Sequence, residues 1–360
     1  MNKDYFAVIM AGGGGTRLWP LSTIDHPKQM LEIINGRSLF QISVERLKNF
    51  FEMEQVFVVT VKDQVQDLSF QVQSLPNSNF IIEPMPRGTA SVVGLAAIHL
   101  LKKNRNAVMA VLTADHVIKN IERFHDLLQK AFLLAQRDYL VTLGIEPTYA
   151  ATGYGYIKAG SKLETPEAFW VERFIEKPEK DTADKFFRKG GYFWNSGMFI
   201  WRAERILSEF KKQMPWVYDK LIAIYDHLDT ADADEFIHKI WPTVEKQTID
   251  YGIMEKADEV VVLSGKDLQW RDIGSWDSIY DLLEPDDKGN IVKNSKEVLI
   301  DSENVLIFSD DPKKMIATIG LKDIVIVNCD KALLICKKGE SQRVKDIIEK
   351  LKGNDQKEYL

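Results

Sequence analysis

Cysteine is almost absent from this 360-residue sequence, which contains only Cys329 and Cys336. Two cysteines are too few for the disulfide scaffold of a small secreted protein, and they lack the paired spacing of a zinc site. No run of about 18 apolar residues, the length that a membrane-spanning helix needs, occurs either. A secretory signal does not fit, because a glycine cluster ends the first apolar run, residues 5–10. We therefore predict a cytoplasmic protein that binds no membrane.

An excess of positive charge is also missing. The sequence has 47 Lys and Arg against 53 Asp and Glu, a formal net charge of −6, which argues against a general nucleic-acid binder. The hydrophobic share of 45% and the charged share of 28% are typical of a globular protein with a substantial core. Because the chain is longer than one core usually supports, we expect a large domain and a smaller one.

Apolar runs alternate with amphipathic stretches in the first 145 residues. The runs that predict buried strands are 5–10, 56–60, 80–83, 107–113 and 139–143. Helical patterns lie between them, one from Ser38 to about residue 50, one from Thr89 and one after Asn120. This alternation predicts a Rossmann-like, doubly wound α/β fold with a mostly parallel sheet.

The pattern changes after residue 150 and again after residue 283. Strand patterns at 154–159, 169–178 and 198–201 precede helical patterns over 203–238, and 259–265 returns to a strand pattern. The charged, turn-rich segment 284–290 is a plausible linker. Short β-type runs then lead to an amphipathic helix at 341–351. We expect a large domain over 1–284 and a small β-rich domain over 290–360.

A glycine-rich segment, AGGGGTRLWPLSTIDHPKQM, directly follows the first predicted strand. Its four consecutive glycines, residues 12–15, allow backbone N–H groups to approach an anion closely. Arg17 and Lys28 add positive charge, and the guanidinium can hold a phosphate through two parallel hydrogen bonds. The alternative is a tight turn beside exposed cations, but the two cations together favour a phosphate site. The segment matches neither a Walker A loop nor the dinucleotide-binding fingerprint.

This segment resembles the sugar-nucleotidyltransferase signature GGxGTRLxPLT…PK. Trp19 and the triplet PKQ make it similar to bacterial mannose-1-phosphate guanylyltransferases, and the resemblance recurs along the whole chain. It implies a GT-A-like nucleotidyltransferase domain over 1–284, and a C-terminal domain related to left-handed β-helices that is often used in dimerisation. We therefore expect a homodimer. The resemblance also implies that Arg17 and Lys28 are catalytic and that the nucleotide is bound by Ala11, Gly12, Gly13, Gly14, Gly15 and Thr16.

The segment FIIEPMPRGTA ends another predicted strand at Glu83. In the family a side chain at this place recognises the nucleobase. Guanine offers two adjacent donors, and an ionised carboxylate can accept both hydrogen bonds. The alternative is an exposed glutamate before a proline turn. Gly88 departs from the family, whose guanylyltransferases usually have asparagine there, and this departure leaves the identity of the base open.

Two aspartates lie far apart in sequence, Asp115 after the predicted strand 107–113 and Asp272 in the segment LQWRDIGSW. Because ligands of parallel sheets bind beyond the carboxyl ends of the strands, Asp115 can lie near the glycine segment and Glu83. The resemblance makes Asp115 and Asp272 the two ligands of Mg²⁺. The alternative is a turn or helix-capping role for each aspartate. We assign no catalytic role to His116.

The segments TGYGYIKAG, ERFIEKP and NSGMF follow in the order that the family has at its sugar-binding end. Lys177 resembles the family lysine that contacts the sugar phosphate, and the resemblance implies that it is catalytic as well. Gly155, Glu176 and Asn195 match positions that bind sugar hydroxyl groups. Taken alone, an EKP triplet is common on protein surfaces, and Gly197, the glycine of the NSG triplet, could equally mark a β-bulge.

The resemblance implies that mannose 1-phosphate attacks the α-phosphorus of GTP, giving GDP-mannose and pyrophosphate. The second pKa of a phosphate monoester is roughly 6, so the nucleophile is already ionised near neutral pH and no general base is needed. Mg²⁺ and the cationic side chains would offset repulsion between the phosphates. Two alternatives stay open: another sugar 1-phosphate, such as glucose or a heptose, or another triphosphate; and a regulatory homologue that binds nucleotide-sugar without catalysis.

Overall fold

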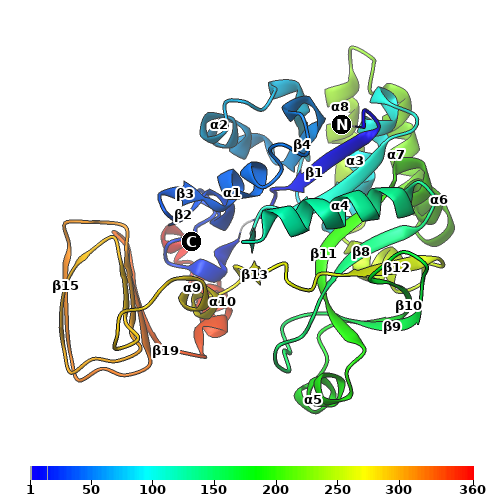
Figure 1. Ribbon diagram of the computed structural model, residues 1–360. Coiled ribbons are helices and arrows are strands. Elements are labelled where there is room, and N and C mark those ends of the chain that lie inside the picture. Colours follow the sequence, from blue (N-terminus) through cyan, green and yellow to red (C-terminus); the bar gives the residue numbers. More distant parts are fainter. Residues whose placement is uncertain (1, 14) are drawn as a thin grey trace. The chain divides into compact units, whose positions relative to one another are not determined.

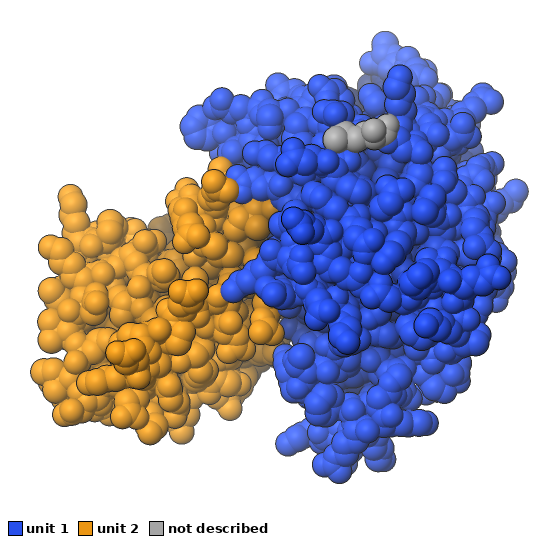
Figure 2. Space-filling view, in the orientation of Figure 1, with its two compact units in different colours: residues 1–12, 44–114, 118–270 blue, residues 13–43, 115–117, 271–360 orange. Residues whose placement is uncertain are grey.

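The computed structural model describes residues 2–13 and 15–360, so Gly14, one of the predicted nucleotide-binding residues, lies outside the described part. The chain divides into two compact units, coloured separately in Figure 2. Unit 1 comprises residues 1–12, 44–114 and 118–270, and unit 2 comprises residues 13–43, 115–117 and 271–360. These units reflect packing and do not follow chain order. The two domains predicted from the sequence, 1–284 and 290–360, stay a prediction.

Unit 1 is built on a nine-stranded sheet with the strand order β5-β4-β1-β6-β11-β8-β12-β10-β9 (Figure 1). Its strands are β1 (Tyr5–Met10), β4 (Val56–Thr60), β5 (Phe80–Ile82), β6 (Val108–Thr113), β8 (Leu140–Ile145), β9 (Tyr156–Lys162), β10 (Ala168–Ile175), β11 (Tyr192–Arg202) and β12 (Val260–Ser264). The five strands predicted in the first 145 residues are all present, with ends shifted by at most a few residues.

The sheet changes direction at β11. Strands β5, β4, β1 and β6 pair in parallel, whereas β11 pairs antiparallel with β6 and β8. Strands β8 and β12 are parallel, and β10 and β9 continue antiparallel. The α/β fold is confirmed, but the sheet is mixed rather than mostly parallel. The sequence predicted only residues 198–201 for β11, because the polar Asn-Ser-Gly segment hid the aromatic residues before it.

Helices cover the sheet of unit 1. One apolar cluster joins β1, β4 and β6 to α3 (Thr89–Lys103), α6 (Ala203–Gln213) and α7 (Pro215–His227). Helix α4 (Ile121–Ala135) packs against β6, β8 and β11, and the Asn120 side chain caps it by accepting from the Arg123 backbone N–H at 3.1 Å. Helix α1 (Leu39–Glu45), most of which belongs to unit 2, ends earlier than predicted, because residues 46–50 form turns and Asn49 adopts a φ of 67°. The remaining helices are α2 (Lys62–Gln71), α5 (Lys180–Lys189) and α8 (Ala233–Ile240).

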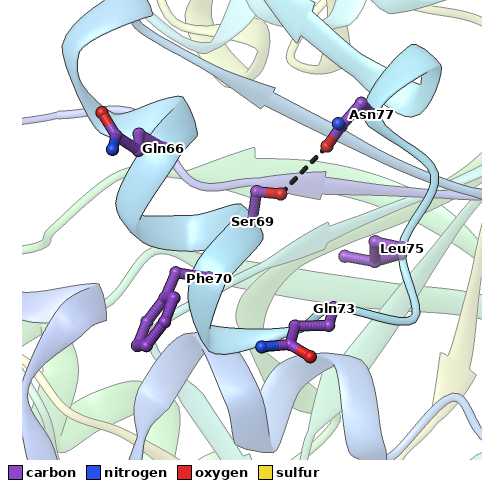
Figure 3. A pocket seen from close by; sticks show the side chains of 6 residues that line it. All are labelled: Gln66, Ser69, Phe70, Gln73, Leu75 and Asn77. Carbon is purple, nitrogen blue, oxygen red and sulfur yellow. Dashed lines mark hydrogen bonds between the residues drawn. The ribbon is translucent and has the colours of Figure 1, made fainter.

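A surface pocket of about 400 Å³ lies beside α2 (Figure 3). Its lining is amide, hydroxyl and apolar: Gln66, Ser69, Phe70, Gln73, Leu75 and Asn77. The Ser69 hydroxyl donates to the Asn77 side-chain oxygen at 2.9 Å. These lining residues include no ionisable side chain and no predicted site residue, so the pocket lacks the charge that a phosphate ligand requires.

Unit 2 contains the predicted β-rich tail. Strands β14 (Ile291–Lys293), β16 (Leu306–Ser309) and β18 (Ile324–Asn328) pair in parallel, and β19 (Leu333–Lys337) adds antiparallel to β18. Between them in sequence, β15 (Lys296–Ile300) and β17 (Met315–Ile319) form a second parallel sheet. Strands β14 to β18 thus alternate between two parallel sheets, as in a β-helix, and β19 joins the sheet of β18. Helices α9 (Trp276–Leu282) and α10 (Val344–Gly353) also belong to this unit, as does the short antiparallel pair of β2 (Glu32–Ile34) and β3 (Arg37–Ser38).

Two apolar residues of the glycine-rich segment belong to the core of unit 2. Leu18 and Trp19 share one buried cluster with Trp276, Leu306 and Ile348. Residues 13–43 are therefore held by residues 271–360 and not by local contacts alone. Among the described residues, no helix combines the length and the apolar character needed to cross a membrane.

Candidate functional site

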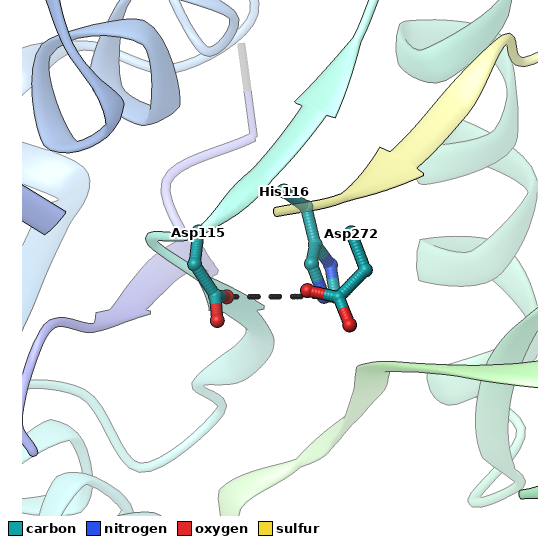
Figure 4. A group of neighbouring side chains, drawn as sticks. All are labelled: Asp115, His116 and Asp272. Carbon is teal, nitrogen blue, oxygen red and sulfur yellow. Dashed lines mark ion pairs between the residues drawn. The ribbon is translucent and has the colours of Figure 1, made fainter. Parts of the chain in front are cut away.

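Asp115, His116 and Asp272 bring three potential metal-ligand atoms within 4.8 Å of one another in unit 2 (Figure 4). Asp115 follows β6, and Asp272 ends β13 (Trp270–Asp272), which pairs with β7 (His116–Ile118). The backbone N–H of Ile273 donates to the Asp115 carbonyl at 3.1 Å, and this contact holds the two segments in register. The fold thus places the two aspartates close together, although 156 positions (272 minus 115, less one) separate them.

Lys28 lies against this acidic group. Its ammonium donates to Oδ2 of Asp115. Burial would raise the pKa of Asp115, but the charges of Lys28 and His116 outweigh burial and hold that pKa well below its usual range. Burial likewise opposes the charge on Lys28, but Asp115 and Asp272 raise the pKa of its ammonium above the ordinary value. Asp115 is therefore an ionised carboxylate beside a charged lysine.

The donor set suits a hard divalent cation. Carboxylate oxygens are the ligands that Mg²⁺ and Ca²⁺ prefer, and an ionised Asp115 needs no proton release before it binds a metal. His116 adds an imidazole whose Nε2 lies 3.8 Å from Oδ1 of Asp115. His116, to which the sequence assigned no role, therefore belongs to the same group by position.

Gly15 provides the space in which Lys28 packs beside the acidic group. Gly15 has a φ of 39°, and a Cβ there would lie 2.6 Å from Cγ and 2.9 Å from the backbone nitrogen of Lys28. Only glycine leaves room for the lysine to pack so closely. Gly13 also has a positive φ, 112°. Arg17, in the 3₁₀ turn Thr16–Leu18, has an exposed side chain, which leaves its guanidinium accessible to a phosphate.

Glu83 is a buried acid in unit 1, only 2% exposed, which rules out the alternative of an exposed glutamate. Its Oε1 accepts hydrogen bonds from the Arg87 backbone N–H at 2.8 Å and from the Ser91 hydroxyl at 3.3 Å. Its Oε2 lies 3.9 Å from the point that a Cβ on Gly12 would occupy. Burial raises the pKa of Glu83 to about 7, against the lowering effect of these hydrogen bonds. Hydrogen bonds thus hold one carboxylate oxygen of Glu83, and the other oxygen lies on the side of Gly12.

Gly88 has a structural reason to be glycine. Its φ is 91°, and a Cβ there would lie 2.3 Å from the carbonyl oxygen of Gln247. The two segments are joined by backbone hydrogen bonds, from Gln247 to the Arg87 carbonyl at 3.0 Å and from Ala90 to the Gln247 carbonyl at 3.2 Å. The asparagine that the family usually has at this position cannot fit unless the backbone near residue 247 moves.

Four residues predicted for the sugar end lie together in unit 1. The backbone N–H of Asn195 donates to the Gly155 carbonyl at 2.8 Å, and a Cβ on Gly155 would lie 2.6 Å from Oε2 of Glu176. The exposed Lys177 donates to Oε1 of Glu176 at 2.5 Å. A carboxylate, an amide, an ammonium group and the backbone of a glycine therefore meet at one place, which suits a polyhydroxylated phosphate ester.

Asp250 joins this group and was missed from the sequence. Its Oδ1 accepts a hydrogen bond of 2.6 Å from the Asn195 side-chain amide. Burial raises the pKa of Asp250, and the nearby Glu176 carboxylate adds to the rise. Asp250 begins a π-helical turn, Asp250–Met254, a feature that occurs often at functional sites. A polar residue inside the otherwise apolar pattern IDYGIM was the available signal.

The predicted site residues divide by chemistry between the units. The base and sugar residues, Glu83, Gly155, Glu176, Lys177 and Asn195, belong to unit 1. The metal and phosphate residues belong to unit 2, apart from Ala11 and Gly12 at the end of β1, and comprise Gly13, Gly15, Thr16, Arg17, Lys28, Asp115 and Asp272. Ala11 continues the pairing of β1 with β4, since its backbone N–H donates to the Val59 carbonyl at 2.9 Å.

Comparisons with known proteins identify the family of this chain. The sequence matches the family Nucleotidyl transferase over residues 6–289, and the MannoseP isomerase/GMP-like beta-helix domain over residues 295–351. It is 38% identical over 360 residues to a mannose-1-phosphate guanylyltransferase of Klebsiella pneumoniae, covering 98% of this chain and 75% of that protein. It is 37% identical over 359 residues to the alginate biosynthesis protein AlgA of Pseudomonas aeruginosa, covering 98% and 73%.

A solved structure matches nearly the whole chain. It is that of a mannose-1-phosphate geranyltransferase from Thermus thermophilus, with a TM-score of 0.86 and 28% sequence identity, and the match covers 97% of this chain and 99% of that one. The fold and the sequence therefore point the same way. This chain is a nucleotidyltransferase that belongs to the mannose-1-phosphate guanylyltransferase family.

Proposed function

We propose that this protein transfers GMP from GTP to α-D-mannose 1-phosphate, forming GDP-mannose and pyrophosphate. The observation that carries the proposal is that Asp115, Asp272 and Lys28 lie close together. Their group combines two carboxylates that can bind a metal ion with a lysine that can bind a triphosphate. The substrates come from the activities by which the relatives are named. The buried acid Glu83 and the polar group around Asn195 supply candidate contacts for a base and a sugar.

The reaction joins an oxygen of the sugar phosphate to the α-phosphorus of GTP and breaks the bond from that phosphorus to the bridging oxygen of the leaving pyrophosphate. Arg17 and Lys28 would hold the triphosphate and offset the charge that builds on the leaving group. Lys177 would hold the sugar phosphate. A base to remove a proton is not required, because the sugar phosphate is already ionised near neutral pH.

We infer that the cation is Mg²⁺, held by Asp115 and Asp272. Mg²⁺ usually binds proteins through one or two carboxylates and completes its coordination with substrate phosphates, which matches this donor set. When bound, it would neutralise phosphate charge and align the two substrates. The contact between Lys28 and Asp115 keeps a positive charge at the same place.

Base and sugar recognition follow from the two polar groups of unit 1. We infer that Glu83 reads guanine through Oε2, since its Oε1 already accepts two hydrogen bonds from the protein. Glu176, Asn195 and Asp250 would bind sugar hydroxyl groups, with Gly155 leaving the space that they need. The pairing of Asn195 with Asp250 supports a shared role.

We further propose a homodimer, formed through the outer face of β15 and β17. Val298, Ile300, Met315 and Ile319 are all between 47% and 71% exposed, and Ile300 lies directly beside Ile319 across the strand pair. Neighbouring exposed apolar side chains of this kind often mark a protein–protein interface. Ile319→Asp should lower the mass measured by light scattering to that of a monomer, whereas Phe70→Asp, at an exposed residue of α2, should not.

We also infer a cytoplasmic location, supported by the two unpaired cysteines.

Pyrophosphate release tests the proposed function. GTP, mannose 1-phosphate and Mg²⁺ together should give pyrophosphate, and omission of any one should abolish it. Glucose 1-phosphate, a heptose 1-phosphate and the other nucleoside triphosphates, tested in the same assay, separate the alternative substrates. Binding of GDP-mannose without any turnover would instead favour the regulatory homologue and contradict the proposal.

A further inference from the structure

The glycine-rich segment is buried against residues near the other end of the sequence. Leu18 and Trp19 share a buried cluster with Val344 and Ile348 of α10 and with Leu360. Helix α10 packs directly on the 3₁₀ turn Thr16–Leu18. Leu18 is completely buried, whereas its neighbour Arg17 is exposed. The side chain expected to reach the triphosphate therefore projects from a turn whose opposite side is fixed by α10.

Trp19 is held from two directions by hydrogen bonds. Its indole N–H donates to the backbone carbonyl of Tyr359 at 2.6 Å. Its own carbonyl accepts from the indole N–H of Trp276 at 3.1 Å, and Trp276 lies four positions after Asp272. Trp19 thus connects three parts of unit 2: the turn that carries Arg17, the segment that contains the predicted metal ligand Asp272, and the residues next to Leu360.

We infer that residues 344–360 are a positioning element for the triphosphate site. Val344, Ile348 and Leu360 are not themselves predicted site residues, yet they share a buried cluster with Leu18, in the turn that carries Arg17. Electrostatic stabilisation of phosphates depends on preorganised charges, so a small displacement of this turn should weaken triphosphate binding strongly. The inference rests on the proposed function in one respect, namely that Arg17 and Lys28 bind the triphosphate.

A matched pair of substitutions separates positioning from general stability. Ile348→Ala removes support beneath the turn, and Ile307→Ala removes an equal number of buried atoms from a separate cluster formed with Val305 and Ile326. Both residues lie in unit 2 and both changes should lower the melting temperature. Only Ile348→Ala should raise KM for GTP, on the order of tenfold, while KM for mannose 1-phosphate stays unchanged. Ile348→Val should restore most of the loss.

The affinity for Mg²⁺-GTP, measured by calorimetry, tests the inference without relying on turnover. If the wild-type protein releases no pyrophosphate, the proposed function fails, but the two alanine variants can still be compared for GTP binding. Equal weakening in Ile307→Ala and Ile348→Ala, or no weakening in Ile348→Ala, would overturn the inference. If Ile348→Ala does not fold, Trp19→Phe provides the second test, because it removes the indole donor to Tyr359 but keeps an aromatic ring in the cluster and should also weaken GTP binding selectively.

Discussion

The side-chain amide of Asn195 donates a 2.6 Å hydrogen bond to Asp250, a carboxylate on a segment that sequence motifs did not identify. The two residues lie on different elements, β11 and the π-helical turn Asp250–Met254. Glu176 and Gly155 lie beside them. This relationship makes Asp250 part of the proposed sugar site.

Replacement of Asp250 by asparagine should weaken use of the sugar phosphate. The amide has nearly the same shape but loses the charged acceptor, so KM for mannose 1-phosphate should rise about tenfold, the effect of one hydrogen bond to a charged group. KM for GTP should not change. Asp234→Asn, at an exposed acid of α8, serves as the control. Equal losses for both substrates would place Asp250 outside sugar recognition.

Asp272→Asn should leave the fold intact and lower kcat by about a hundredfold or more, because the substitution removes one of two carboxylates from the predicted cation site. Activity should be measured over a range of Mg²⁺ concentrations, with the melting temperature as a check on folding. Asp267→Asn changes an exposed aspartate of the same loop region and should retain activity. Near-normal, Mg²⁺-dependent turnover in Asp272→Asn would remove that residue from the metal site.

Gly88→Ala should destabilise the protein more than Gly190→Ala. Both glycines adopt backbone angles that other residues avoid, with φ 91° and ψ 173° at Gly88 and φ 68° and ψ −179° at Gly190. Only at Gly88 would a Cβ meet another atom, the Gln247 carbonyl oxygen. The free energy of unfolding should therefore fall by at least about 2 kcal/mol more in Gly88→Ala. Equal losses in denaturant unfolding would show that the contact with Gln247 relaxes freely.

Glu83 should make stability fall as pH rises. Burial raises its pKa from the ordinary 4.5 to about 7, so between these values the folded protein binds the proton that the unfolded chain releases. Its contribution is most favourable below pH 4.5 and is lost progressively up to about pH 7. Glu83→Gln removes this dependence, so the variant should gain stability relative to the wild type at pH 8 compared with pH 5.

The same substitution tests base recognition. Glu83→Gln should erode the preference for GTP over other triphosphates, because it replaces one carboxylate oxygen by an NH2 donor, which must face either the Arg87 N–H and Ser91 hydroxyl or the guanine donors. Competition assays with the four nucleoside triphosphates measure this preference. Unchanged selectivity would mean that another residue reads the base, and a parallel pH slope in wild type and variant would mean that Glu83 titrates normally.

The sequence by itself determined the local chemistry of this protein. The apolar runs predicted β1, β4, β6, β8 and β12, and the glycine-rich segment with Arg17 and Lys28 indicated a phosphate site. Asp115 and Asp272 could be proposed from the family resemblance alone. These features are visible because side-chain periodicity and short motifs report what a segment does with its nearest neighbours in the chain.

The tertiary structure decided what distant segments do to one another. It inserted the antiparallel β11 between β6 and β8, brought Asp250 to Asn195, and placed the Gln247 backbone where a side chain on residue 88 would lie. It also packed Leu18 and Trp19 of the glycine-rich segment against α10. Contacts of this kind depend on the shape of the assembled core, which no pattern along a single stretch of chain encodes.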